Sequence, residues 1–228
     1  MTHTLRTTGW MLMMLLASLI ALLSLRYFTL NQAVFTQPLG EKFLRNLGMF
    51  LTHAFGGILA LALGPWQFWA GLRNKHLQLH RWIGRLYLFG VLVGGIGGLY
   101  LATIAYSGLP TRIGFGMLGT LWLGTGAMAY QRIRQRDIER HREWMIRNYA
   151  LTFAAVTLRL WLPLLMALGF NFLDSYITVA WFCWVPNLLV AELFIGLARD
   201  AREKQRVKAE TARMTTASAS PVQVISRT

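Results

Sequence analysis

The apolar positions of this chain are gathered into long runs, and the polar positions fall almost entirely between those runs. A helix rises about 1.5 Å per residue, so about 20 apolar residues are needed to cross the hydrocarbon core of a bilayer. Six runs have about this length, namely residues 9–30, 47–71, 83–106, 113–131, 144–169 and 174–197. The pattern therefore predicts an all-α, polytopic membrane helix bundle with six transmembrane helices.

The runs divide the chain into four predicted regions. They are a first, uncleaved transmembrane anchor (1–30), an outer loop with an interfacial helix (31–46), the bundle core (47–198) and a basic, partly disordered cytoplasmic tail (199–228). The anchor is expected to stay uncleaved because its apolar run is long for a signal peptide and no small-residue cleavage site follows it. The interfacial helix is expected because Phe35, Leu39 and Phe43 recur at helical spacing.

The charge of the chain is uneven, with 23 Lys and Arg against 9 Asp and Glu. Nucleic acid is not the expected partner, because the basic residues sit in short clusters between apolar runs. The segments 73–85 and 132–147 hold ten of them and the tail from Arg199 on holds seven, whereas 31–46 and 107–112 hold three. Basic loops stay on the cytoplasmic side, so both termini are expected there, with anionic lipids as partners of the basic loops and tail.

A short motif occurs twice, 61 residues apart, each time after an apolar run and a basic loop. It reads HRWIGRLY at 80–87 and HREWMIRNY at 141–149. Both copies begin a run that is directed outward, so spans 2–3 and spans 4–5 are hypothesised to be two hairpins related by a parallel repeat. In that arrangement His80 and His141 lie at equal depth at the cytoplasmic face.

With these motifs the chain resembles a bacterial family of predicted multi-pass membrane proteins that is catalogued as a domain of unknown function. The resemblance covers about residues 47–197 and also rests on the GPWQF segment at 64–68 and on Arg159. It implies a helical fold in a bacterial inner membrane and no particular activity. The layout is similar to that of b-type cytochromes and ferric-reductase-like membrane domains as well, a likeness of architecture that does not establish function.

His80 and His141 are the candidate ligands of a haem iron. Neutral imidazoles are good axial ligands, and two that face each other can hold a b-type haem. Arg81 and Arg142 follow them directly and, with Arg85 and Arg147, would lie near the anionic propionates. The alternative is that both His-Arg pairs are interfacial and bind lipid phosphates and backbone groups.

His53 and Arg159 lie inside predicted spans, where a titratable or charged side chain needs a partner. Both fall in the outer half, and Arg159 stands about 22 Å from the inner face. They are predicted to form an outer polar site with Trp161, and with Gln67 if a kink at Gly64-Pro65 allows it, suited to a quinone carbonyl or an anionic group. Two alternatives stay open: a structural His53 bonded to a neighbouring helix, and an Arg159 that extends outward to Asn171 or Asp174.

Small residues mark the third and fourth runs, and Gly90, Gly94 and Gly98 share one helical face. Such a face lets a second helix approach closely. Tight packing is the expected role, and a flat cofactor lying against the face is the alternative.

The function expected from these residues is that of a membrane redox subunit, which binds b-type haem or interacts with quinone and passes electrons to a membrane redox partner. The alternative is a cofactor-free membrane protein: an accessory subunit, a lipid-binding protein or a small transporter. The chain contains no GxSxG, HExxH or Walker motif, which argues against hydrolase and nucleotide-dependent chemistry.

Overall fold

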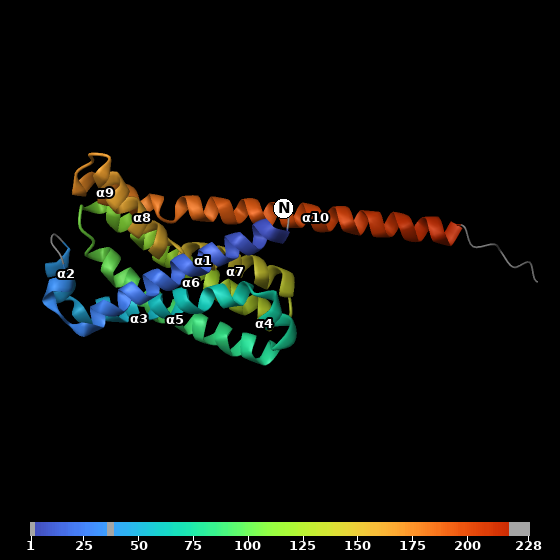
Figure 1. Ribbon diagram of the computed structural model, residues 1–228, viewed down its shortest axis with the longest axis horizontal. Helices are drawn as coiled ribbons and strands as arrows, with labels where there is room; N and C mark the ends of the chain where they lie inside the picture. Colours follow the sequence, from blue (N-terminus) through green and yellow to red (C-terminus); the bar gives the residue numbers. More distant parts are fainter. Residues whose placement is uncertain (1–2, 36–38, 219–228) are drawn as a thin grey trace, which may run out of the picture.

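The computed structural model describes residues 3–35 and 39–218, and within these ranges all regular elements are helices. The longer helices are α1 (His3–Ser24), α3 (Leu47–Phe68), α5 (Leu77–Thr103), α6 (Leu109–Arg134), α7 (Ile138–Thr152), α8 (Ala154–Ala167), α9 (Phe172–Phe182) and α10 (Val185–Ser218). The shorter ones are η1 (Leu25–Thr29), η2 (Gln32–Val34), α2 (Gly40–Arg45) and α4 (Ala70–Lys75). The predicted all-α membrane helix bundle is confirmed (Figure 1).

The bundle has two ends, which we call the tail end and the α9 end. At the tail end lie α4 and the start of α7, and α10 leaves the bundle there (Figure 1). At the α9 end lie α2 and α9 (Figure 1). The long helices run back and forth between these ends, and α3, α5, α6 and α7 pack against one another in a four-helix core.

Five stretches of the described chain are long and apolar enough to cross a membrane, namely Thr7–Thr29, Leu47–Phe68, Leu77–Thr103, Ile138–Ala167 and Phe172–Ala212. The run 113–131, predicted as the fourth of six spans, lies in α6, which is not among these five. Glycines, threonines and Arg112 make α6 less apolar than its neighbours. The six predicted spans thus correspond to the five stretches of spanning character and to α6, which packs against α5 and α7.

The outward faces of the helices are apolar. Leu22 of α1, Leu92 of α5 and Leu189 of α10 are 65%, 52% and 66% exposed, and further large apolar side chains flank them. Soluble monomers rarely expose contiguous apolar surface on this scale. Lipid is therefore the medium around the bundle.

The fifth and sixth predicted spans are each interrupted and are not single helices. The interruptions lie at Phe153, between α7 and α8, and at Cys183, between α9 and α10. Thr157 donates to the Cys183 carbonyl over 2.5 Å, and Asn187 donates to the Ala150 and Cys183 carbonyls over 3.2 and 2.9 Å. These side chains satisfy carbonyls at helix ends, and they join the two interruptions.

Local sequence fixes the turns at the α9 end. Gly108, with φ of 83°, precedes α6, and Pro110 stands in the first turn of that helix. Gly169, with φ of 96°, follows α8, and Asn171 then caps α9 by accepting from the backbone N–H of Asp174 over 2.9 Å. Residues with a Cβ are strained at such positive φ values, which favours glycine at both turns.

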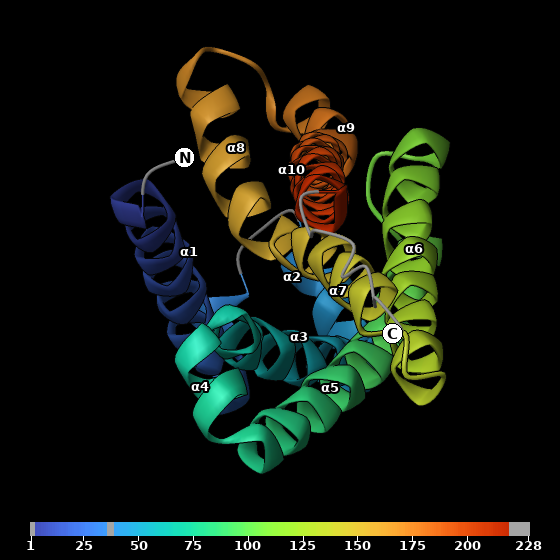
Figure 2. The same ribbon diagram turned by 90° about the vertical axis from the view of Figure 1, so that its right-hand side faces the viewer.

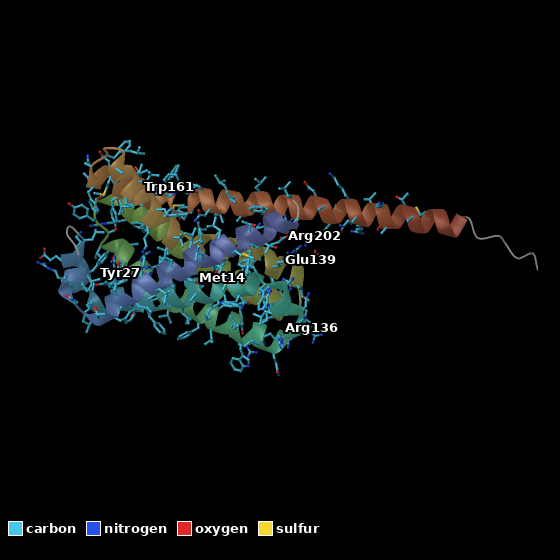
Figure 3. All side chains as sticks on the ribbon, in the orientation of Figure 1. Met14, Tyr27, Arg136, Glu139, Trp161 and Arg202 are labelled. Carbon is cyan, nitrogen blue, oxygen red and sulfur yellow. The ribbon has the colours of Figure 1, made fainter. Side chains whose placement is uncertain are left out.

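The segment predicted as an outer interfacial helix is only partly helical among its described residues. Its α-helix is the short α2, and residues 36–38 lie outside the described ranges. Phe35 and Phe43 pack on Phe50 of α3, with ring centroids 5.6 and 4.6 Å apart. Aromatic contacts therefore hold this segment on the end of the bundle, where Tyr27 also lies (Figure 3).

The last helix continues well past the tail end, and ion pairs attach its middle to α7. Glu143 accepts hydrogen bonds from Arg199 and Arg202, and Arg202 also pairs with Glu139 over 3.1 Å (Figure 3). Within the described part of the tail α10 remains helical to Ser218, and the predicted disorder of the final residues falls on 219–228, outside the described ranges.

Helices α3 and α5 touch through glycine backbone. A Cβ placed on Gly56 would collide with the backbone nitrogen of Gly94 and lie 2.5 Å from the carbonyl oxygen of Gly90. Helix α3 therefore covers the glycine face of α5, as predicted for tight packing, and leaves no room there for a flat cofactor.

Substituting Gly56→Val should lower the free energy of unfolding by about 1–3 kcal/mol, because the new side chain forces α3 away from α5. Thermal unfolding of the purified protein in detergent, followed by tryptophan fluorescence, measures the loss. The control is Gly57→Val, since a Cβ at Gly57 meets no atom within 4 Å. Equal stability of the two variants would contradict the close α3–α5 contact.

Candidate functional site

His80 and His141 lie in the first turns of α5 and α7. Helix α5 starts at Leu77, earlier than the predicted run at 83, so the first motif is helical throughout. Further into the bundle the Tyr87 hydroxyl donates to Asn148 Oδ1 over 2.6 Å. That pair is also separated by 61 residues, so α5 and α7 run in register and the two histidines stand at equal depth.

The two imidazoles are close enough for the charge of one to act on the other. Nδ1 of His141 lies 2.8 Å from the Ala129 carbonyl oxygen of α6. A carbonyl only accepts, so this nitrogen carries the proton and Nε2 is left as a potential ligand. Nδ1 of His80 is buried and has no hydrogen-bond partner among the described residues, which is rare for a buried polar atom.

Basic groups surround this histidine pair. Arg73 of α4 and Arg81 of α5 act on the charge of His80, and Nε of Arg132, at the end of α6, is buried without an acceptor among the described residues. Arg142 is exposed on α7 and is not without an interaction partner. The end of the four-helix core thus concentrates positive charge around two imidazoles.

Gln67 belongs to this end of the bundle as well. Its Nε2 donates to the His80 carbonyl oxygen over 3.4 Å, and a Cβ on Gly84 would lie 3.1 Å from its Oε1. The prediction that Gln67 joins His53 and Arg159 is therefore wrong, because α3 continues past Pro65 to Phe68 and carries Gln67 to the tail end.

A buried polar network lies in the core beyond the histidines. Nδ2 of Asn148 donates to the Trp122 carbonyl over 2.6 Å and to Thr125 Oγ over 2.8 Å. Thr152 Oγ accepts from the Trp122 indole over 2.8 Å and lies 2.9 Å from the Tyr87 hydroxyl. Sequence reasoning did not single out Asn148, Thr125 or Thr152, although Asn148 and Thr152, one turn apart in an apolar run, were a signal. The network ties α5, α6 and α7 together.

His53 is held by the helix beside it. Its Nδ1 lies 2.8 Å from the Gly94 carbonyl oxygen, and a Cβ on Gly98 would come within 2.9 Å of the same nitrogen. Of the two alternatives for this residue, the hydrogen bond to a neighbouring helix is the one observed. As in His141, Nδ1 must carry the proton because a carbonyl only accepts, so Nε2 is unprotonated in the neutral ring.

Arg159 extends toward α1 and not toward Asn171 or Asp174. Its guanidinium donates to the Ala155 carbonyl over 2.8 Å and to Ser24 Oγ over 3.3 Å. Asp174, the outward partner considered from the sequence, accepts from the Asn171 side chain instead, over 2.7 Å. Ser24, the last residue of α1 and part of the first apolar run, was missed as a site residue. Arg159 is also close enough to act on the charge of His53.

Within residues 3–35 and 39–218, no group of three or more His, Cys, Asp or Glu side chains could hold a metal ion. A b-type haem needs only two protein ligands, because the porphyrin nitrogens supply the others. The two histidines at the tail end therefore match haem iron in the type and number of protein ligands that it needs. The buried Nδ1 of His80, which has no partner among the described residues, is compatible with such a ligand.

Residues 50–195 match the family model described as "Predicted membrane protein (DUF2306)". The matched range includes both histidine motifs, Arg159 and all of α5 to α9. No curated protein and no solved structure matches the chain.

Substituting Asn148→Leu should lower the free energy of unfolding by about 1–3 kcal/mol, because Tyr87, Thr125 and the Trp122 carbonyl each lose a partner in the core. The measurement is the midpoint of thermal unfolding in detergent. Asn74→Leu, at an exposed position of α4, is the control and should leave the midpoint unchanged. A variant at position 148 as stable as the control would show that this network does not hold α5, α6 and α7 together.

Proposed function

The chain belongs to the DUF2306 family of predicted membrane proteins, and from its histidine pair we propose that it is a membrane redox subunit that binds a b-type haem. The observation that carries the proposal is the position of His80 and His141 at equal depth on two parallel helices. Two imidazoles from parallel helices stand in register, close enough to interact, and one of them has a buried nitrogen without a partner in the described chain.

His80 and His141 would be the axial ligands of this haem, which when bound supplies one-electron transfer. The hydrogen bond from His141 to the Ala129 carbonyl orients the ring and fixes which nitrogen can ligate. Arg73 and Arg81, together with Arg142, would neutralise the propionates. These residues bind and orient the cofactor and balance its charge.

The proposal includes a location and partners for the protein. We place the protein in a bacterial inner membrane with the tail end in the cytoplasm, because the basic segments 73–85 and 132–147 and the charged part of α10 gather at that end. Anionic lipids would bind there. Quinone or another membrane redox protein would exchange electrons with the haem.

A second candidate function is supported by the packing of the core. Helix α3 covers the glycine face of α5, and the network around Asn148 is bonded internally. Both features suit a cofactor-free protein, such as an accessory subunit, a lipid-binding protein or a small transporter, in which the His-Arg motifs serve the membrane interface.

The absorption spectrum of protein purified from haem-replete cells separates the two functions. The redox subunit should show a Soret band and, on reduction, sharp α and β bands. His80→Ala and His141→Ala should each remove these bands, because an axial ligand is lost. His76→Ala, at the exposed histidine that precedes α5, is the matched control and should keep them.

A colourless wild-type protein from such cells would reject the haem proposal and favour the cofactor-free alternative. Bands that persist in both alanine variants would also reject the assignment of His80 and His141. Gel filtration of each variant checks that a lost spectrum does not result from a lost fold.

A further inference from the structure

Arg159 carries a charge that no carboxylate neutralises in the part of the chain that the structure describes. Its two hydrogen bonds go to neutral acceptors, the Ala155 carbonyl and Ser24 Oγ. Its remaining N–H groups have no acceptor among the described residues, since a guanidinium carries five donors. A cation inside a span is costly unless it finds a partner, and such residues commonly mark sites of function.

The surroundings of this guanidinium are formed by three helices. Arg159 belongs to α8, Ser24 ends α1 and His53 lies on α3. Helix α1 packs against both α3 and α8, and Figure 2 shows α1 and α8 together on one side of the bundle. Ser24 is itself fixed, because its hydroxyl donates to the Ile20 carbonyl over 2.7 Å while it accepts from Arg159. The guanidinium is therefore held in place by the protein.

The position is open to lipid. Arg159 is only half-buried, and its neighbour Leu160 and the α1 side chain Leu23 are 50% and 49% exposed. From Arg159 to the end of α8 at Ala167 is about 12 Å at about 1.5 Å per residue. The head of an amphiphile lying in the leaflet of the α9 end can therefore reach the guanidinium while its chain stays among the lipid tails.

We propose that Arg159 binds the oxyanion head of an amphiphile, either the carboxylate of a fatty acid or the phosphate of a phospholipid, with Ser24 as the positioning residue. An oxyanion neutralises the guanidinium and accepts two parallel hydrogen bonds from its planar fork, whereas a quinone carbonyl is neutral and does not offset the charge. Nδ1 of His53 is already bonded to the Gly94 carbonyl. This ring therefore lies beside the site, and its Nδ1–H group does not bond to the oxyanion.

The test is native mass spectrometry of delipidated protein in detergent, titrated separately with oleate, with dioleoyl phosphatidylglycerol and with decylubiquinone. The wild-type chain should retain one molecule of an oxyanion probe, and the probe that binds more tightly identifies the source of the head group. Arg159→Gln should bind it about tenfold more weakly, because a charge-assisted bidentate contact is lost. Arg112→Gln, at an exposed arginine near the same end of the bundle, should bind like the wild type.

Three results would overturn the proposal: no retained oxyanion probe on the wild-type chain, equal binding by Arg159→Gln and Arg112→Gln, or Arg159-dependent binding of decylubiquinone alone. Ser24→Ala provides a second variant if Arg159→Gln does not fold, and it should weaken the same probe. The site is independent of the proposed haem, so Arg159→Gln should keep any haem bands, and the two proposals can fail separately.

Discussion

A polar group inside a bilayer has no water to bond, so the protein itself must supply its partner. The 2.6 Å hydrogen bond between Tyr87 and Asn148 provides a partner for both side chains. It also fixes the register of α7 along the axis of α5. The amide of Asn148 also bonds to two groups of α6, so one side chain ties three helices. The pairing of His80 with His141 depends on this registration, because each histidine stands seven residues before the bonded pair.

Different kinds of contact hold the other helices. Between α3 and α5 the backbones themselves touch at Gly56 and Gly94, so dispersion over a close approach replaces side-chain packing. Toward the tail end, α10 is attached to α7 by charges, with Arg147 forming a bidentate pair with Glu192 over 2.5 and 2.8 Å. Arg147, one of the arginines expected near the propionates, is thus paired with Glu192. The packing contact is indifferent to salt, whereas exposed ion pairs weaken as ionic strength rises.

Much of the fold could be predicted because lipid restricts the choices to apolar helices and to small residues where helices meet. The helix-packing role of Gly94 followed from spacing along a single helix. The interruption at Phe153 could not be predicted from the sequence, because the apolar run around it looks continuous. The hydrogen bond that accompanies it, from Thr157 to the Cys183 carbonyl, reaches a residue that is distant in the sequence. The Ser24 partner of Arg159 was hidden for the same reason: the two residues are 135 positions apart, and no periodicity links them.

The two helix interruptions have a mechanical consequence. Thr157 of α8 is bonded to the Cys183 carbonyl at the end of α9, and Asn187 of α10 reaches the same carbonyl and that of Ala150 in α7. These bonds couple α8 to α9 at the point where both passes are interrupted, so a displacement of α8 is expected to shift α9 as well. Arg159 belongs to α8. A ligand held by its guanidinium would therefore act on the same junction, where Asn187 bonds the start of α10 to Ala150 of α7.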